Sequence, residues 1–311
     1  MTEKIYDLVI IGAGPSALTA AIYTTREDID TLLIEKGAVG GLMATIDKIE
    51  NYPGFPDGIE GLALATDFQE QAERFGAKIE LAEVQQVAQA GKTFRITTDA
   101  GEFLAKTVLI ASGNGYRKLG IPGEEEHAHY CATCDGAFYR DKKLAVVGGA
   151  NSAIQEAMFL TKFATHVDLV VRSRIKASEI LKKELESYVQ SGKITVHEGW
   201  TPDEIVAKDG QVTAVTAHQT DEPSNKQTIQ VDGVFVFAGV IPNTAFLADS
   251  GVELDRSGHV VTDENLMTKI PGIFASGDVR SGATKQVSSA CGEGTTAALA
   301  IREYLHEIAK E

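Results

Sequence analysis

Cysteine is scarce in this chain, and long apolar runs are missing. Three cysteines among 311 residues cannot form the disulfide framework of a small secreted protein, and they fit a reducing compartment better. The longest apolar stretches, such as Leu8–Ile11 and Val234–Val240, have the length of strands and are too short to cross a bilayer. No cationic N-terminal segment leads into an apolar one, so no secretory signal is expected. These absences predict a cytoplasmic location.

An excess of positive charge is also missing. The chain has 44 acidic and 29 basic residues and a net charge of −15 at pH 7, which argues against nucleic acid and an anionic membrane as partners. Hydrophobic residues make up 43% of the sequence, without low-complexity tracts. The composition is therefore that of a globular protein with two ordinary domains or one large domain.

The N-terminal segment has the pattern of a nucleotide-binding strand–turn–helix–strand unit. Residues 5–11 form a continuous apolar run typical of a buried parallel strand, residues 18–23 predict a helix, and residues 31–35 predict a second strand. The turn before the helix, Gly12-Ala13-Gly14-Pro15-Ser16-Ala17, has GxGxxA spacing. That spacing is informative here because a strand precedes it and a helix follows it.

The residue types in this turn are those that a dinucleotide-binding turn needs. Gly12 permits the tight turn, Gly14 lets the backbone approach a pyrophosphate, and Ala17 allows close packing of helix on strand. The helix N-terminus supplies N–H groups and a positive dipole end to phosphates. Glu35 lies 23 residues after Gly12, at the end of the second strand, where a carboxylate accepts hydrogen bonds from ribose hydroxyls. The alternative is a glycine-rich turn with a surface glutamate.

The same pattern recurs in the middle of the chain. A strand, a Gly-Gly-Ala-Asn-Ser-Ala turn, a helix and a second strand are predicted at residues 143–147, 148–153, 154–163 and 167–171. Basic residues follow this second strand, namely Arg172, Arg174 and Lys176. Cations at this position suit the 2′-phosphate of NADP, whereas an acid suits a free ribose. Two different dinucleotides are therefore expected.

A CxxC motif, Cys131-Ala132-Thr133-Cys134, lies between the two turns and is followed by Asp135. A lone CxxC is a weak signal, because it can also be half of a zinc site or a pair of core thiols. No second CxxC completes a metal site, so no metal is predicted, and Cys291 is distant in sequence. A dithiol flanked by two dinucleotide sites indicates an electron relay.

Loop-rich segments mark where the chain passes between domains. Residues 113–123 and 239–243 are rich in glycine, asparagine and proline. They predict an inserted pyridine-nucleotide-type domain at 116–243, which carries the dithiol, and a first domain made of 1–115 and 244–311. The expected fold class is α/β, with two Rossmann-like three-layer (ββα-type) nucleotide-binding domains, the first of them discontinuous.

Seven segments of the chain resemble the low-molecular-weight thioredoxin reductases and occur in the same order as in that family. They are GAGPSA (12–17), ENYPGF (50–55), CATCDGAFY (131–139), GGANSA (148–153), GVIPN (239–243), ASGDV (275–279) and KQVSSACGEG (285–294). The resemblance covers essentially the whole chain. It implies FAD in the discontinuous domain, NADPH in the inserted domain, and a homodimer that reduces the disulfide of thioredoxin or a thioredoxin-like protein.

The resemblance also implies an FAD site, residue by residue. The residues along FAD would be Gly12, Gly14, Pro15, Ser16, Glu35, Lys36, Gly41, Leu42, Asn51, Gly277, Asp278, Gln286 and Val287. Leu42 departs from the family, because many members have glutamine there. The final helix, which begins near Val287, would direct its dipole at the flavin edge that is negative when reduced.

At the dithiol, the resemblance implies that Cys134 lies beside the flavin and that Cys131 attacks the partner disulfide. Asp135 would be the general acid/base that protonates a leaving thiolate. A simple turn residue is the alternative interpretation of Asp135.

Two histidines and the third cysteine receive weaker interpretations. His127 and His129 could lower the pKa of a thiol, but we interpret them as surface loop residues. We interpret Cys291 as a small packing residue near the start of the last helix.

The second turn departs from the family pattern. Ala150 stands where GxGxxA has its second glycine, and a methyl group there limits how closely the backbone approaches a pyrophosphate. The basic segment after residue 171 is also about one residue shorter than the family's arginine clamp. NADPH contacts are implied at Gly149, Asn151, Ser152, Arg172 and Arg174. Reduced ferredoxin is an equally open electron donor.

Two other functions stay open beside the FAD-dependent disulfide reductase. A dithiol oxidase would pass electrons from the dithiol through FAD to oxygen without a nicotinamide, and the altered second turn favours it. A redox sensor would bind FAD without turnover. We expect the reductase, with NADPH or reduced ferredoxin as its donor.

Overall fold

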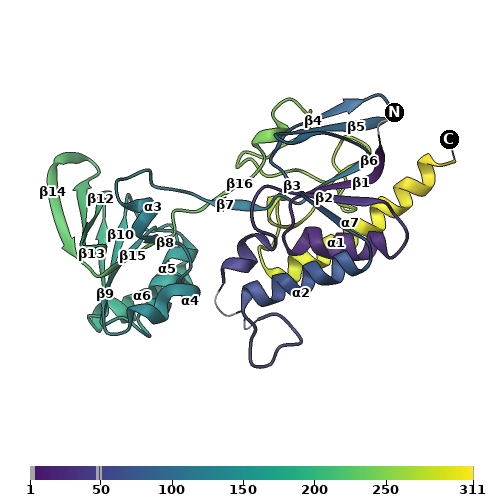
Figure 1. The fold of residues 1–311 in the computed structure, drawn as a ribbon. Coiled ribbons are helices and arrows are strands. Elements are labelled where there is room, and N and C mark those ends of the chain that lie inside the picture. The colour runs from purple at the N-terminus through teal and green to yellow at the C-terminus, as the bar shows by residue number, and fades with distance from the viewer. Residues whose placement is uncertain (1–3, 47–48, 50, 311) are drawn as a thin grey trace. The chain divides into compact units, whose positions relative to one another are not determined.

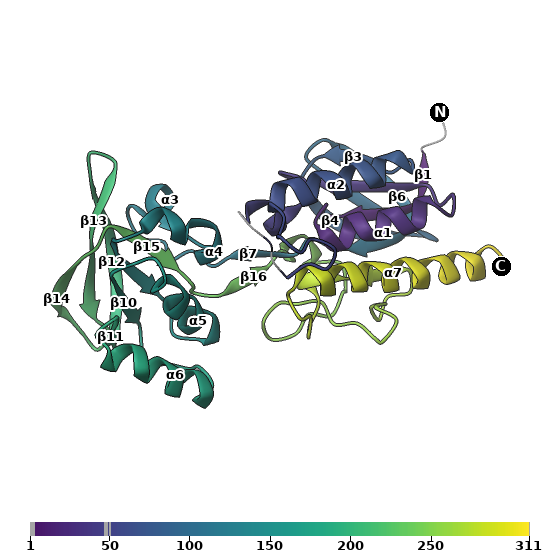
Figure 2. The same cartoon turned by 90° about the horizontal axis from the view of Figure 1, so that it is seen from below.

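The computed structural model describes residues 4–46, 49 and 51–310, apart from the side chains of Thr133 and Cys134. The chain forms two compact units, one made of 1–115 with 241–311 and the other of 116–240. Figures 1 and 2 show their elements in two views. Within the described ranges, no helix is long and apolar enough to cross a membrane.

The first unit is built on a seven-stranded sheet in the order β3-β2-β1-β6-β5-β4, with β17 also paired to β6. Strands β1 to β6 and β17 comprise Ile5–Ile11, Thr31–Glu35, Lys78–Leu81, Val84–Ala90, Thr93–Thr98, Gly101–Ile110 and Ile273–Ala275. The pairings among β1, β2, β3, β6 and β17 are parallel, whereas β4, β5 and β6 form an antiparallel meander.

Three helices accompany this sheet (Figure 1). They are α1 (Pro15–Thr25), α2 (Gly61–Arg74) and α7 (Val287–Ile308), and short 3-10 helices lie at Gly41–Thr45, Ala245–Leu247 and Gly277–Val279. Because neighbouring side chains of a strand point to opposite faces, β1 contributes side chains to the packing on both faces of the sheet. Leu8 and Ile10 pack with residues of α1 and α7, and Val9 and Ile11 pack with residues of the meander.

The second unit has a five-stranded parallel sheet in the order β11-β10-β9-β15-β8 and a three-stranded antiparallel sheet β12-β13-β14. Strands β8 to β15 comprise Ala128–His129, Lys143–Val147, His166–Val171, Ile194–Glu198, Trp200–Lys208, Gln211–Gln219, Glu222–Gln230 and Gly233–Val236. The helices are α3 (Glu124–His127), α4 (Ala132–Asp135), α5 (Asn151–Leu160) and α6 (Glu179–Gln190), with a 3-10 helix at Gly136–Tyr139.

The second unit repeats the layering of the first. Leu144 and Val146 of β9 pack with residues of α5 and α6, whereas Ala145 and Val147 pack with residues of the antiparallel sheet. The two passages of chain between the units, β7 (Asn114–Tyr116) and β16 (Val240–Pro242), pair as a two-stranded sheet. The predicted α/β fold with two Rossmann-like three-layer domains is confirmed. Which nucleotide each unit binds stays a prediction.

Candidate functional site

The first glycine-rich turn joins β1 to α1 and borders open space. Gly12 has a φ of +105°, and a Cβ there would lie 2.5 Å from the carbonyl oxygen of Ala111, so only glycine fits. Gly14 is the N-cap of α1, Pro15 is the first helical residue, and no side chain caps this helix. A Cβ on Gly14 would have no heavy atom within 4 Å. The helix N-terminus therefore faces room for a phosphate group.

Glu35 ends β2 and is held against this turn. Its Oε2 accepts a hydrogen bond from the backbone N–H of Ala13 at 2.8 Å, and its Oε1 accepts one from Gly37 at 2.9 Å. Each carboxylate oxygen keeps a lone pair for a ribose hydroxyl. Lys36 is exposed and forms an ion pair with Glu83 at 3.7 Å.

The turn at the end of β17 meets the start of α1. The Ser16 and Ser276 hydroxyls are 2.5 Å apart, and a Cβ on Gly277 would lie 3.0 Å from Cβ of Ser16. Asp278 follows in this turn, half-buried, and burial raises the pKa of its carboxyl group. Among the described residues, no group forms a hydrogen bond with that carboxyl group. The carboxyl group of Asp278 can therefore accept a hydrogen bond from a hydroxyl-bearing ligand or donate one to it.

The residues expected at the flavin also meet. Nδ2 of Asn51 donates a hydrogen bond to Oε1 of Gln286 at 3.0 Å. Gln286 is the N-cap of α7, whose first residue is Val287, and no side chain caps this helix either. A Cβ on Gly41 would lie 3.5 Å from Cα of Gly14.

This part of the first unit fits FAD. The open helix N-terminus at Gly14 suits a pyrophosphate, the carboxylate of Glu35 suits a ribose, and the half-buried Asp278 suits a polyol chain such as ribityl. The uncapped α7 adds N–H groups for an electron-rich ring edge. The half-buried Leu42 presents only an apolar surface. The contact of each of these residues with FAD stays a prediction.

The CxxC segment leads into the short helix α4 of the second unit, with Cys131 directly before the helix. Cys131 is disulfide-bonded, and the backbone N–H of Asp135 donates to its carbonyl oxygen at 3.1 Å. The side chain of Cys134, the other predicted catalytic thiol, lies outside the described part of the structure. Cys291 is a free, half-buried thiol of the first unit.

Asp135 belongs to a hydrogen-bonded group of three side chains. Its Oδ2 lies 2.8 Å from Nδ1 of His129, and Nε2 of His129 lies 2.7 Å from the hydroxyl of Tyr139. The His129 ring also stacks on Phe235, with 5.1 Å between the ring centroids. The interpretation of His129 as a surface loop residue is therefore wrong. Its side chain is 28% exposed and belongs to β8.

The sequence contained little that could have identified His129. Its partners lie six and ten residues later, and its ring contact depends on the parallel pairing of β8 with β15, more than one hundred residues away. His127, two residues before it, is half-buried and lies at the end of α3. Within the part of the chain that the structure describes, no three His, Cys, Asp or Glu side chains could together hold a metal ion.

The N-cap residue of the second glycine-rich turn has the same extended backbone as that of the first, but a different side chain. Ala150 caps α5 with φ −97° and ψ 179°, close to the φ −81° and ψ −175° of Gly14. The direction that is open at Gly14 is therefore occupied by a methyl group at Ala150. Gly149 is tightly packed, because a Cβ there would lie 2.6 Å from Cγ1 of Val171.

The basic segment after β10 lies against this turn. Lys176 donates its backbone N–H to the carbonyl oxygen of Gly149 at 2.6 Å, and Ser178 donates its own to Oδ1 of Asn151 at 2.8 Å. Among the described residues, neither Arg172 nor Arg174 forms an ion pair, and both are exposed, as is Ser152. The cations remain available to an anion, but the Asn151 side chain is engaged within the protein.

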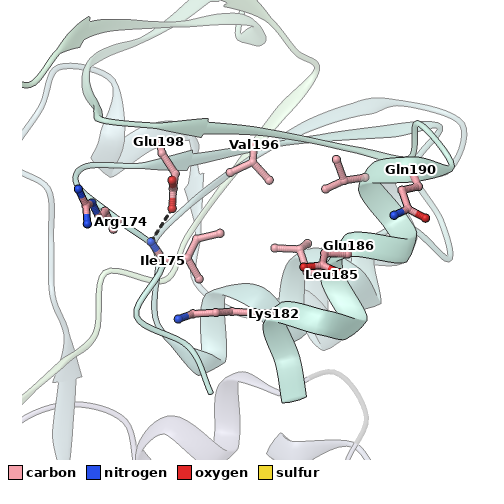
Figure 3. A pocket seen from close by; sticks show the side chains of 9 residues that line it. Arg174, Ile175, Lys182, Leu185, Glu186, Gln190, Val196 and Glu198 are labelled. Carbon is pink, nitrogen blue, oxygen red and sulfur yellow. Dashed lines mark hydrogen bonds between the residues drawn. The ribbon is translucent and has the colours of Figure 1, made fainter. Parts of the chain in front are cut away.

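A surface cavity of about 530 Å³ adjoins the basic segment (Figure 3). Arg174 and Lys182 contribute cations to its lining, and Leu185 and Val196 contribute apolar surface. Glu198 anchors the segment, because its Oε1 accepts the backbone N–H of Ile175 at 2.7 Å.

Comparison with known proteins gives consistent matches over nearly the whole chain. The family model described as pyridine nucleotide-disulphide oxidoreductase matches residues 6–294. Thioredoxin reductase from Listeria innocua is 40% identical, with 98% of this chain and 96% of the relative covered. The Bacillus subtilis thioredoxin reductase is 38% identical with the same coverage.

A solved structure agrees with these sequence matches. The crystal structure of thioredoxin reductase from Lactococcus lactis superposes with a TM-score of 0.79 at 37% identity, covering 97% of this chain and 99% of that one. The two nucleotide-type turns, the disulfide at Cys131 and these end-to-end matches lead to one conclusion: the chain belongs to the low-molecular-weight thioredoxin reductase family of FAD-dependent disulfide reductases.

Proposed function

We propose that this protein reduces the disulfide of thioredoxin or a thioredoxin-like protein through Cys131 and Cys134. The observation that carries the proposal is the disulfide at Cys131, in a CxxC segment followed directly by Asp135, whose backbone N–H donates to the Cys131 carbonyl oxygen. FAD, when bound by the first unit, supplies the two electrons that open this disulfide. Cys131 as a thiolate then attacks the partner disulfide, and Cys134 resolves the mixed disulfide.

NADPH is the electron donor in this proposal. The uncapped N-terminus of α5 supports it, as do Arg172 and Arg174, which are exposed and form no ion pair with any residue that the structure describes. A pyrophosphate and a 2′-phosphate need those two kinds of group. Arg172 and Arg174 would together set a preference for NADPH over NADH.

Reduced ferredoxin is the second candidate donor. The methyl group of Ala150 and the engagement of Asn151 by Ser178 favour it, since both oppose close approach of a dinucleotide to the turn. A protein donor would need neither the turn nor the cations.

Anaerobic mixing of the yellow protein with NADPH, NADH or reduced ferredoxin, followed by flavin absorbance, tests the donor. Fast, saturable bleaching by micromolar NADPH supports the first candidate, and replacing Arg172 and Arg174 with glutamine should then abolish its advantage over NADH. A flavin that stays oxidised in millimolar NADPH but bleaches with ferredoxin establishes the second candidate. A colourless protein that cannot be reconstituted with FAD contradicts the whole proposal.

The direction of electron flow and the assembly are parts of the same proposal. We expect net reduction of thioredoxin rather than a dithiol oxidase. Oxygen consumption with reduced thioredoxin should therefore be slow compared with thioredoxin reduction. The homodimer rests on the family resemblance alone, and sedimentation equilibrium of the FAD-loaded protein measures it.

A further inference from the structure

One arrangement of protons satisfies the group formed by Asp135, His129 and Tyr139. An ionised carboxylate can only accept hydrogen bonds, so Nδ1 of His129 carries the proton and donates to Oδ2 of Asp135. In the neutral imidazole, Nε2 is then an acceptor, and the Tyr139 hydroxyl donates to it. Burial, followed by the charge of Asp135, raises the pKa of Tyr139, which keeps this donor protonated.

The same arrangement survives protonation of Asp135. A carboxylic acid that carries its proton on Oδ1 still accepts a hydrogen bond at Oδ2. His129 therefore does not have to change tautomer when Asp135 gains or loses a proton. One oxygen of Asp135 is fixed by the imidazole, and the proton that exchanges is directed to the other oxygen.

The imidazole is itself held from two sides. Phe235 of β15 stacks on its face, and the ring of Tyr139 meets it edge-on with 5.2 Å between the centroids. Tyr139 packs in turn on Phe235 at 5.7 Å. On the same segment, Tyr130 donates its hydroxyl to Glu124, so those two titratable groups are occupied with each other.

Other histidine–aspartate pairs occur in this chain, and the position of this one sets it apart. His218 and Asp203 approach to 2.6 Å with side chains 22% and 31% exposed, much like the 28% and 30% of His129 and Asp135. That pair joins β12 and β13 of the antiparallel sheet. Asp135, in contrast, is tied to Cys131 by the hydrogen bond between its backbone N–H and the Cys131 carbonyl oxygen.

We infer that His129 is a positioning residue for thiol–disulfide exchange at Cys131, because it fixes Oδ2 of Asp135 and leaves Oδ1 to give and take a proton. The inference rests on the proposed function of the dithiol. Breaking the S–S bond takes two electrons, which bound FAD would supply, and leaves two thiolates that two protons convert into thiols. When Cys131 later attacks a partner disulfide, its thiol loses a proton and the departing partner thiolate gains one. Asp135 carries one proton in each direction.

The test measures reduction of the protein's own disulfide by dithiothreitol as a function of pH, which needs neither thioredoxin nor a flavin donor. His129→Leu removes the hydrogen bond that fixes Oδ2 of Asp135. The rate at neutral pH should fall about tenfold, and the pH profile should differ from that of wild type, because Oδ1 of Asp135 is no longer held in place. His129→Asn keeps a donor near the position of Nδ1 and should recover the rate to within about threefold. His218→Leu is the matched control and should behave as wild type.

A rate and pH profile of His129→Leu equal to those of His218→Leu would overturn the inference. Equal losses in His129→Leu and His129→Asn would also overturn it, since packing alone would then explain them. If His129→Leu does not fold, Tyr139→Phe carries the test, because it removes one hydroxyl and keeps the ring. It should lower the rate and alter the pH profile by a smaller amount than His129→Leu, and an unchanged rate and profile contradict the role.

Nitrogen-15 NMR of the imidazoles gives a readout that does not depend on activity. His218 and His166 also place Nδ1 against an oxygen acceptor, so the signal of His129 is identified by substitution. Wild type should show a neutral histidine with its proton on Nδ1 whose signal is lost in His129→Leu and kept in His218→Leu. A proton on Nε2 of His129 would contradict the inference. Failure to reduce thioredoxin, with the dithiothreitol and NMR results as expected, would instead refute the proposed function and leave the positioning role in place.

Discussion

At the scale of single residues, a methyl group distinguishes the helix N-caps of the two glycine-rich turns. Gly14 and Ala150 both cap a helix with extended backbone and no side-chain cap. Extended backbone is available to alanine without strain, so Ala150 does not distort its turn. Its effect is confined to the space in which a pyrophosphate would lie.

Ala150→Gly should therefore improve the use of NADPH. If NADPH is the donor, kcat/KM should rise by a factor that corresponds to a free energy on the order of 1–2 kcal/mol, because the backbone can approach the pyrophosphate more closely. Steady-state kinetics with thioredoxin measures the change. Flavin reduction by dithionite is the control and should be unaffected. An unchanged kcat/KM for NADPH would show that the methyl group does not limit this site.

Cys291 should react slowly with alkylating agents. Burial raises the pKa of its thiol, and this outweighs the hydrogen bonds from Thr19 and Tyr52 that lower it; burial and the neighbouring thiol raise the pKa of Tyr52 to about 12. As the pH rises, the thiol of Cys291 ionises in the unfolded chain before it ionises in the folded protein. The stability that this thiol contributes to the folded protein is therefore complete below the ordinary thiol pKa, and it is lost as the pH rises through the pKa of the folded protein.

Iodoacetamide labelling of the oxidised protein, read by mass spectrometry, measures this reactivity. Labelling at Cys291 should be slower than labelling of glutathione at pH 8 and should accelerate only at higher pH. Cys291→Ala supplies the background. A rate equal to that of glutathione at pH 8 would show that the thiol is not shielded.

At the scale of elements, the sequence predicted what is local. Strands β1, β2 and β9 have the predicted bounds, because a buried parallel strand is a continuous apolar run. Helix α5 begins at Asn151, earlier than the predicted 154, since no apolar periodicity marks a first helical turn. The antiparallel strands were not located individually. Most residues of β14 are exposed, and its pairing depends on partners that no short window contains.

The two thiols of the CxxC segment, which runs from Cys131 into helix α4, have different expected roles. In Cys134→Ser, the resolving thiol is gone, so Cys131 should stay joined to thioredoxin in a stable mixed disulfide. Cys131→Ser should trap no partner, because the attacking thiol is missing. Non-reducing gels and mass spectrometry of the conjugate distinguish the two variants. A conjugate formed by Cys131→Ser and absent from Cys134→Ser would reverse the assignment.

At the scale of the whole molecule, the second unit interrupts the first. The first unit needs both ends of the chain, because β17 pairs with β6 and α7 packs in the same core as α1. Phe274, Ala297 and Ile301 are at most 1% exposed there. The unit 116–240 has its own sheets and its own core.

This insertion sets the order in which the protein can fold during synthesis. When residue 240 has left the ribosome, the inserted unit is complete and can fold, whereas the first unit still lacks β17 and α7. A protein of residues 116–240 should therefore melt cooperatively by itself. A protein of residues 1–240 should show that transition together with dye-binding apolar surface, because Leu8 and Ile10 would lack the partners that α7 supplies. The N-terminal part of the first unit is thus synthesised first but completes its core last, and it stays exposed to chaperones and proteases until α7 has left the ribosome.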